Sequence, residues 1–198
     1  MYEVEKKFVY NKENKEGVDH LIADSTFLKE VVNDDVYYDT ENYDLLVKET
    51  YLRTRNGSFE LKISQSKKTK SIREIEQHIE IENDSEIRDY LNIKGDGDLK
   101  NDLEKAGYSL RFSYKVIRKK YKNGDFAIDF DKADYGFTSV EIELLVETEK
   151  EMNMAIKKIR NFAKSYGLIK SPMRGKLFEY IYRNNKKAWE KVVNANIV

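Results

Sequence analysis

Acidic residues occur in pairs, separated by one residue, at several places in the chain, and four of these pairs are candidates for one site. The four pairs are Glu-Val-Glu (3–5), Glu-Ile-Glu (74–76), Asp-Phe-Asp (129–131) and Glu-Ile-Glu (141–143). Side chains two residues apart share one face of a strand, so each pair directs two carboxylates to the same side. Carboxylate oxygens are the ligands that hard divalent cations take in proteins. A metal site is therefore one interpretation of this pattern.

Basic residues with the same kind of spacing lie on other segments. Arg53 and Arg55 share a face in YLRTR. Lys62 lies in FELK, and Arg118 ends an apolar run. A polar outer face of a half-buried sheet accounts for any one of these segments, but like charges sorted onto one solvated face repel each other. Since guanidinium and ammonium groups bind phosphate oxygens, we expect an interior lined by both signs that holds a polyphosphate with its metal.

The composition limits the partners and the metal ligands. The chain has 198 residues, and 36 basic residues balance 36 acidic ones. This balance gives no reason to expect nucleic acid or an anionic membrane as a partner. The sequence holds no cysteine, which excludes disulfides and thiolate metal sites, and its two histidines, His20 and His78, are far apart. Any metal is therefore expected to have oxygen ligands, which suit Mg2+, Mn2+ or Ca2+.

The sequence shows no sign of a targeting or membrane segment. No apolar run approaches the roughly 18 residues of a membrane span. Position 3 is already acidic and no apolar stretch follows it, which argues against a signal peptide. We expect a cytoplasmic monomer that does not bind membranes.

The apolar pattern predicts a mixed fold with more strands than helices. Strands are expected over 2–10, 35–40, 50–55, 58–65, 71–81, 108–122, 125–132 and 137–147. Asn56-Gly57 and Asn123-Gly124 each predict a type I′ turn, which joins antiparallel strands. Helices are expected over 18–32, 85–93, 149–167 and 173–193. These elements indicate one α+β domain built on about eight mostly antiparallel strands.

The charged segments follow an order that resembles a known family. Glu3-Val4-Glu5-Lys6-Lys7 is ExExK, the opening signature of the CYTH superfamily, the triphosphate tunnel metalloenzymes. The matching segments after it cover nearly the whole chain: VYYDT (36–40), YLRTR (51–55), FELK (59–62), REIE (73–76), Arg118, IDFD (128–131) and VEIE (140–143). Within the superfamily, the combination of YYDT, LRTRNGSFELK, DFDKADYGFTSVEIE and PMRGKLFEYI is most similar to the thiamine triphosphatases.

This resemblance implies a fold and a set of site residues. The fold would be a single domain over residues 1–198, an antiparallel barrel of about eight strands that is closed or nearly closed around a charged tunnel. The C-terminal helix, at about 173–191, would close one tunnel end. The implied cofactor is Mg2+, with Mn2+ as an alternative, and its ligands would be Glu3, Glu5, Asp129, Glu141 and Glu143, with Glu74 or Glu76 as a further candidate. The residues that hold the triphosphate would be Lys7, Arg53, Arg55, Lys62, Arg118 and Lys176. Lys62 and Tyr37 would act near the reacting phosphates.

The resemblance leaves the substrate open. Tyr51 stands where the thiamine-specific members carry a tryptophan that stacks on the organic cation, and tyrosine stacks more weakly. Thiamine triphosphate is the first expectation, and inorganic triphosphate or a nucleoside triphosphate is the alternative. A class IV adenylate cyclase, which expels pyrophosphate from ATP, and a non-catalytic polyphosphate-binding module are the remaining readings.

Overall fold

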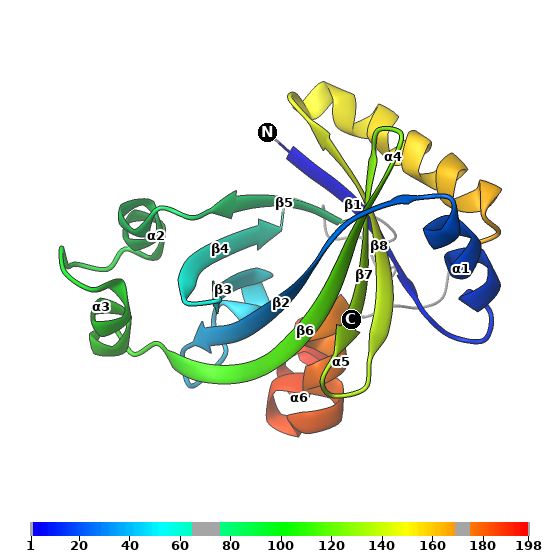
Figure 1. The fold of residues 1–198 in the computed structure, drawn as a ribbon. Coiled ribbons are helices and arrows are strands. Elements are labelled where there is room, and N and C mark those ends of the chain that lie inside the picture. The colour runs from blue at the N-terminus through cyan, green and yellow to red at the C-terminus, as the bar shows by residue number, and fades with distance from the viewer. Residues whose placement is uncertain (1, 65–75, 169–174, 198) are drawn as a thin grey trace.

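Eight antiparallel strands close into one ring in the computed structural model, which describes residues 2–64, 76–168 and 175–197. The order around the ring is β1-β5-β4-β3-β2-β6-β7-β8 (Figure 1). The strands are β1 (Tyr2–Val9), β2 (Thr26–Asp39), β3 (Thr50–Arg55), β4 (Ser58–Ser64), β5 (Glu76–Ile81), β6 (Ser109–Asn123), β7 (Phe126–Ala133) and β8 (Thr138–Val146). This confirms the expected α+β class and the closed antiparallel barrel. Positions 71–75 of the predicted fifth strand lie outside the described residues.

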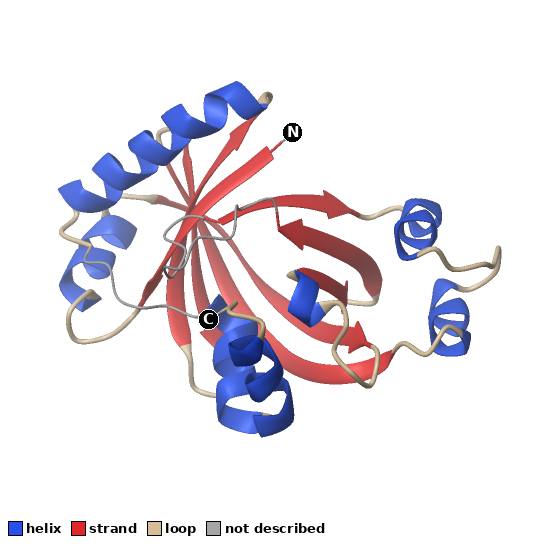
Figure 2. Cartoon of the chain, turned by 180° about the vertical axis from the view of Figure 1, so that it is seen from behind, coloured by secondary structure: helices blue, strands red, loops and turns tan. Residues whose placement is uncertain are grey.

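Helices flank the ring on several sides. They are α1 (Lys15–Ala23), the short 3-10 helix η1 (Leu46–Lys48), α2 (Asp84–Leu91), α3 (Leu99–Lys105), α4 (Glu149–Ser165), α5 (Gly175–Asn184) and α6 (Lys186–Asn194). Helix α4 packs on β1 and β8. Figures 1 and 2 show α1 beside α4, and α2 with α3 at the opposite end of the ring.

The apolar face of each strand on the α4 side points outward, under the helices. Val4 and Phe8 of β1, Ile142 of β8 and Ile159 of α4 belong to one cluster and are at most 1% exposed. Burying each such side chain contributes roughly 1.5–3 kcal/mol to stability. Because side chains alternate along a strand, this outer core leaves the inward positions, such as Glu5, to charged residues.

The C-terminal helices pack against a different surface. Leu177 and Ile181 of α5 and Val192 of α6 share a cluster with Phe112 and Tyr114 of β6. Both aromatic residues lie an even number of positions from Arg118, on the face of β6 that looks into the ring. This placement supports the expectation that the C-terminal segment closes one end of the barrel, a role that stays a prediction.

The helix predicted over 18–32 is wrong beyond residue 23. Helix α1 ends at Ala23, and residues 26–32 belong to β2, which pairs with β6 from Thr26↔Lys122 to Asp39↔Ser109. Phe27 and Leu28, which fit the apolar face of a helix, are 54% and 57% exposed on the strand. Aromatic and β-branched side chains favour strands, and the ladder with β6 outweighs the helical spacing.

The two predicted hairpins form, but only one turn has the predicted centre. Asn56 and Gly57 have φ angles of 52° and 91°, as a type I′ turn requires. In the second hairpin, Asn123 belongs to β6 and pairs with Phe126. The loop is therefore Gly124-Asp125, and its positive φ, 54°, falls on Gly124. The predicted turn is wrong by one residue because Asn123 extends the ladder.

The predicted helix over 173–193 is two helices within the described residues. Asn185 separates α5 from α6, with φ −142° and ψ 87°, and its side-chain oxygen accepts a hydrogen bond from the Ala188 amide at 3.0 Å. Asparagine competes for backbone donors in this way at helix starts. Helix α3 was not predicted, and Asp98 caps it by accepting from the Lys100 amide.

Candidate active site

Strands β1, β8 and β7 lie side by side and place their acidic pairs on one surface. The ladders pair Glu5 with Glu143, and Glu141 with both Lys7 and Asp129. Directly paired residues of antiparallel strands point to the same face. We call this surface the acidic wall, and its members are Glu3, Glu5, Asp129, Asp131, Glu141 and Glu143. It faces the inside of the ring, since its side chains contact residues of β4, β6 and α5.

Two carboxylates of the acidic wall are tightly neutralised. Arg118 donates to both oxygens of Asp131 at 2.7 Å and to Glu141 Oε2 at 2.7 Å. Lys176 Nζ donates to Asp131 Oδ2 at 2.6 Å and to Glu141 Oε1 at 2.5 Å. Burial alone would raise the pKa of Asp131 and of Glu141, but Lys176 and Arg118 outweigh it and hold both pKa values below their usual range. We call Asp131 and Glu141 the paired carboxylates.

Three other carboxylates of the wall have raised pKa values. Burial, followed by the neighbouring charges of Glu141, Asp129 and Glu5, raises the pKa of Glu143 to about 9. Burial also raises the pKa of Glu3, against the effect of Lys62. It raises the pKa of Asp129 as well, against the effect of Arg118. We call Glu3, Asp129 and Glu143 the crowded carboxylates.

A divalent cation fits beside Glu143, where further carboxylates of the wall converge. One oxygen from each of Glu5, Glu141 and Glu143 lies within 4.8 Å of the others. Asp129 Oδ1 is buried and makes no hydrogen bond within the described part of the chain. Converging carboxylate oxygens are the donor set of Mg2+ and Mn2+.

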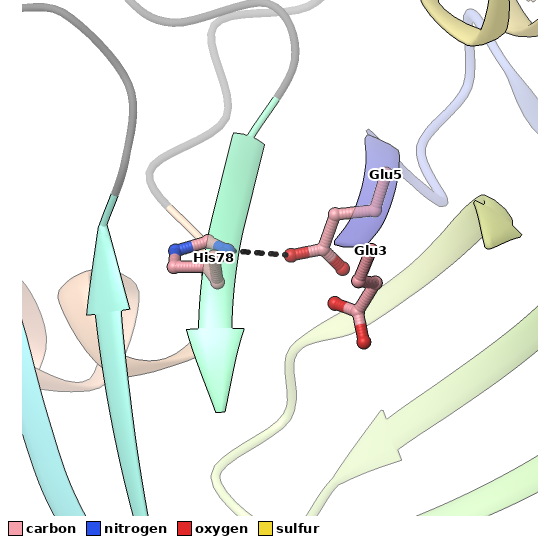
Figure 3. A group of neighbouring side chains, drawn as sticks. All are labelled: Glu3, Glu5 and His78. Carbon is pink, nitrogen blue, oxygen red and sulfur yellow. Dashed lines mark ion pairs between the residues drawn. The ribbon is translucent and has the colours of Figure 1, made fainter. Parts of the chain in front are cut away.

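A second group of possible ligands includes a histidine. The ladder between β1 and β5 pairs Glu3 with His78. One ligand atom from each of Glu3, Glu5 and His78 lies within 4.8 Å of the others, and His78 Nδ1 is 3.6 Å from Glu5 Oε1 (Figure 3). The expectation of purely oxygen ligands overlooked this side chain, because the register that places it opposite Glu3 cannot be read from the sequence.

The predicted phosphate-binding residues on β3 contact carboxylates. Arg55 forms a bidentate ion pair with Asp35. Its Nε donates to Oδ1 at 2.8 Å and its Nη2 donates to Oδ2 at 3.0 Å. Arg53 donates to Glu60 Oε2 at 2.9 Å through Nε and lies 3.7 Å from Asp35 through Nη1. Arg53 is 9% exposed, and Arg55, two residues further along β3, lies on the same face.

The predicted lysines also contact the acidic wall. Lys7 Nζ donates to Glu5 Oε1 at 2.8 Å. Lys62 Nζ lies 3.0 Å from Glu3 Oε1, 3.0 Å from Glu80 Oε1 and 3.7 Å from Glu5 Oε1. The fold thus gathers basic and acidic side chains from strands that are distant in sequence into one set of contacts.

The two residues expected near the reacting phosphates lie at different points. The Tyr37 hydroxyl is 3.0 Å from the Tyr114 hydroxyl and accepts from Arg53 Nη1 at 3.4 Å. Within the part of the chain that the structure describes, no hydrogen bond joins Tyr37 to Lys62. The Tyr51 ring packs edge-on against Phe178, with ring centres 6.0 Å apart.

Two further predicted ligands are less defined. Glu74 lies outside the described residues. The backbone of Glu76 pairs with Glu5 in the β1–β5 ladder. The choice between these two residues stays a prediction.

Sequence reasoning missed several residues that contact the site. They are Asp35, Glu60, His78, Glu80 and Asp131. A signal existed for some of them, since Asp131 completes an acidic pair and Glu60 lies two residues before Lys62. The register between strands, which the sequence does not give, decides the others.

No helix in the described ranges is both long enough and apolar enough to cross a membrane.

Known proteins share this fold. The sequence matches the CYTH domain family over residues 1–172. The chain is similar to the PH1819 protein of Pyrococcus horikoshii, with a TM-score of 0.63 and 23% identity over 92% of this chain and 99% of that chain. It is also similar to a candidate adenylate cyclase of Vibrio parahaemolyticus, with a TM-score of 0.57 and 18% identity over 92% of this chain and 98% of that chain.

A candidate adenylyl cyclase from Hippeastrum, described as having a dominant triphosphatase activity, is a further similar structure. Its TM-score is 0.55, with 16% identity over 91% of this chain and 95% of that chain. At these identities the likeness to solved structures shows the fold alone.

Proposed function

The chain belongs to the CYTH domain family, and on that premise we propose that it is a metal-dependent triphosphatase that removes the terminal phosphate of thiamine triphosphate. CYTH proteins act on small triphosphates, and the Hippeastrum protein is described as having a dominant triphosphatase activity. One observation carries the proposal: buried arginine and lysine side chains meet a wall of carboxylates inside the ring.

Basic side chains would bind the triphosphate by exchanging partners. Arg53, Arg55 and Lys62 each contact a carboxylate through N–H groups that can also donate to phosphate oxygens. An arginine has five such donors, so it can keep one carboxylate contact and add a phosphate contact. Lys7, Arg118 and Lys176 would complete the set from the side of the acidic wall.

The acidic wall would hold the metal. Glu3, Glu5, Asp129, Glu141 and Glu143, with Glu74 or Glu76, are the proposed ligands of Mg2+ or Mn2+. When bound, the ion would polarise phosphate oxygens and lower the pKa of a coordinated water. Arg118 and Lys176 fix the orientation of Glu141 from two sides, so this ligand would need little rearrangement.

Lys62 and Tyr37 would serve the reaction from separate positions. The ammonium of Lys62 stays charged, because Glu5 and Glu3 outweigh the effect of burial and raise its pKa. It would donate to a phosphate oxygen and stabilise the negative charge that develops as the terminal phosphate leaves. Tyr37, next to Arg53, would donate to the same chain of phosphates from β2.

Tyr51 would contact the organic part of the substrate. Its ring packs against Phe178 of α5 and lies 6.5 Å from the His78 ring. An aromatic face can stack on the cationic thiazolium of thiamine. Inorganic triphosphate, which has no organic part, is the alternative substrate, followed by a nucleoside triphosphate.

A substrate panel tests the proposal. Purified protein is incubated with Mg2+ or Mn2+ and, separately, thiamine triphosphate, inorganic triphosphate or ATP, and phosphate, pyrophosphate and cyclic AMP are measured. We expect phosphate release, fastest from thiamine triphosphate. Cyclic AMP as the main product would replace the hydrolase by a cyclase, and no turnover of any triphosphate would favour a non-catalytic binding module.

Glu141→Gln tests the metal site directly. The amide keeps the shape of the side chain but loses the charge that a metal ligand needs. We expect kcat to fall by about 100-fold or more, as for a missing catalytic electrostatic contact, with an unchanged circular dichroism spectrum. Glu30→Gln is the control, since Glu30 is 50% exposed on the outside of β2 and should keep the wild-type rate. A wild-type rate in Glu141→Gln would remove this residue from the metal site.

A further inference from the structure

We propose that His78 supplies a nitrogen ligand to a cation held by Glu3 and Glu5, and that this position therefore prefers a transition-metal ion such as Mn2+ to Mg2+. The inference rests on the proposed function, because it specifies the donor set of that same site. The expected set of ligands contained oxygen atoms only, so the imidazole changes the chemistry of the site.

The strand register builds this group of ligands. Glu3 and His78 are direct partners in the β1–β5 ladder, so their side chains point to the same face. Glu5 lies two residues after Glu3 on the same strand and shares that face. His78 is 5% exposed and its imidazole is held next to the two carboxylates (Figure 3).

The three side chains are close enough to share one ion. One ligand atom from each residue lies within 4.8 Å of the other two. Two ligands at about 2.1 Å from a common metal can be at most about 4.2 Å apart, so small rotations of the side chains would complete the coordination. Glu3 is the most movable of the three, with its side chain 21% exposed.

Lys62 shows that this position already accommodates a positive charge. Its ammonium lies 3.0 Å from Glu3 Oε1 and 3.7 Å from Glu5 Oε1. Lys62 also lies 3.0 Å from Glu80 Oε1. It can therefore release Glu3 and Glu5 to a metal ion and keep an ion pair with Glu80.

The imidazole sets the preference among metals. Mg2+ is a hard ion that binds oxygen ligands and dehydrates reluctantly. Imidazole nitrogen suits first-row transition metals, whose affinities increase from Mn2+ towards Cu2+. The neighbouring group of Glu5, Glu141 and Glu143 offers oxygen atoms only. Two positions that share Glu5 would thus differ in their choice of metal.

Electron spin-echo spectroscopy of bound Mn2+ tests the nitrogen ligand. The full-length protein is stripped with EDTA and loaded with Mn2+ without any triphosphate. Modulation from a directly bound nitrogen is measured in the wild type, in His78→Gln and in His20→Gln. We expect the nitrogen signal in the wild type and in His20→Gln, and its loss in His78→Gln.

His20→Gln is the matched control because His20 is exposed on α1 and is the other histidine of the sequence. This variant retains His78 as its one histidine, so an imidazole signal in it can come only from His78. It therefore tests the nitrogen ligand even if His78→Gln does not fold. Absence of the nitrogen signal in the wild type, or its persistence in a folded His78→Gln, would overturn the proposal.

Calorimetric titrations measure the preference itself. His78→Gln should weaken Mn2+ binding by about tenfold or more, the range seen when groups supporting a metal are removed. Mg2+ binding should change by less than about threefold, since a glutamine oxygen replaces a nitrogen that Mg2+ does not favour. Equal weakening for both ions would contradict the assigned preference.

The test of the nitrogen ligand and the test of the proposed function can give different results. A protein that hydrolyses triphosphates but shows no nitrogen signal keeps the function and loses this inference. A protein that shows the signal but turns over no triphosphate keeps the inference and loses the proposed function.

Discussion

The paired and the crowded carboxylates lie on the same wall, yet their charges are balanced very differently. Asp131 and Asp129 are both 1% exposed and are two residues apart on β7. Burial would raise the pKa of Asp131, but Lys176 and Arg118 outweigh it and lower this pKa, whereas burial prevails at Asp129 and raises its pKa. The depth of burial therefore does not decide the state of these acids; the position of two cations does.

This difference suggests a division of labour. Arg118 and Lys176 satisfy both oxygens of Asp131 and fix Glu141, which gives the paired carboxylates one defined arrangement. At the crowded carboxylates burial prevails over the nearby cations, and it raises the pKa of Glu143 to about 9. A bound cation would supply the missing charge where the protein itself does not.

Removing Arg118 should have the largest effect on stability. Arg118→Met leaves Asp129, Asp131 and Glu141 without their shared partner, and breaking such a buried network costs about 3–5 kcal/mol. Urea unfolding at pH 7 with EDTA measures the change. Lys119→Met is the control, because Lys119 is 47% exposed on the outer face and lies 3.8 Å from Glu30. Equal effects of the two variants would show that the paired carboxylates do not depend on Arg118.

Glu143→Gln tests the crowded carboxylates, because it should change the dependence of stability on pH. The folded pKa of Glu143 is raised from 4.5 to about 9, so its contribution to stability is complete below pH 4.5 and is lost as the pH rises towards 9. Glutamine does not titrate. The variant should therefore gain stability relative to the wild type between about pH 5 and pH 9, by at most about 1.4 kcal/mol per pH unit. Urea unfolding of EDTA-treated protein across this range measures the gain.

Asp131→Asn is the matched test of the opposite sign. The lowered pKa of Asp131 gives stability that is present above the unfolded pKa of 3.8 and is lost as the pH falls through the folded value. The loss of stability of Asp131→Asn relative to the wild type should be complete at pH 7 and should become smaller below pH 4. Parallel pH profiles for the two variants would remove the distinction between paired and crowded carboxylates.

Lys120→Met should have the smallest effect. Lys120 lies 3.7 Å from Asp129, but its side chain is 37% exposed and solvent screens the pair. Such pairs contribute about 0–1 kcal/mol, so we expect a loss within that range in urea unfolding. A loss close to that of Arg118→Met would mean that Lys120, rather than a bound cation, neutralises Asp129.

The sequence by itself determined most of the strands and the faces of their side chains. Period-two alternation in VEIEL and FELKI separated buried apolar from charged positions, and Asn56-Gly57 fixed one hairpin. It also determined that like charges occur in pairs, because two residues is the repeat of a strand.

Only the tertiary structure decided which charges meet. Register between strands brings His78 opposite Glu3, and ring closure brings Arg118 to Glu141. The same long-range pairing turned residues 26–32 into strand, and it separated Tyr37 from Lys62. Local pattern fixes the face on which a side chain lies, but its neighbours come from segments that are distant in sequence, and their positions are set by the hydrogen-bonded closure of the whole sheet.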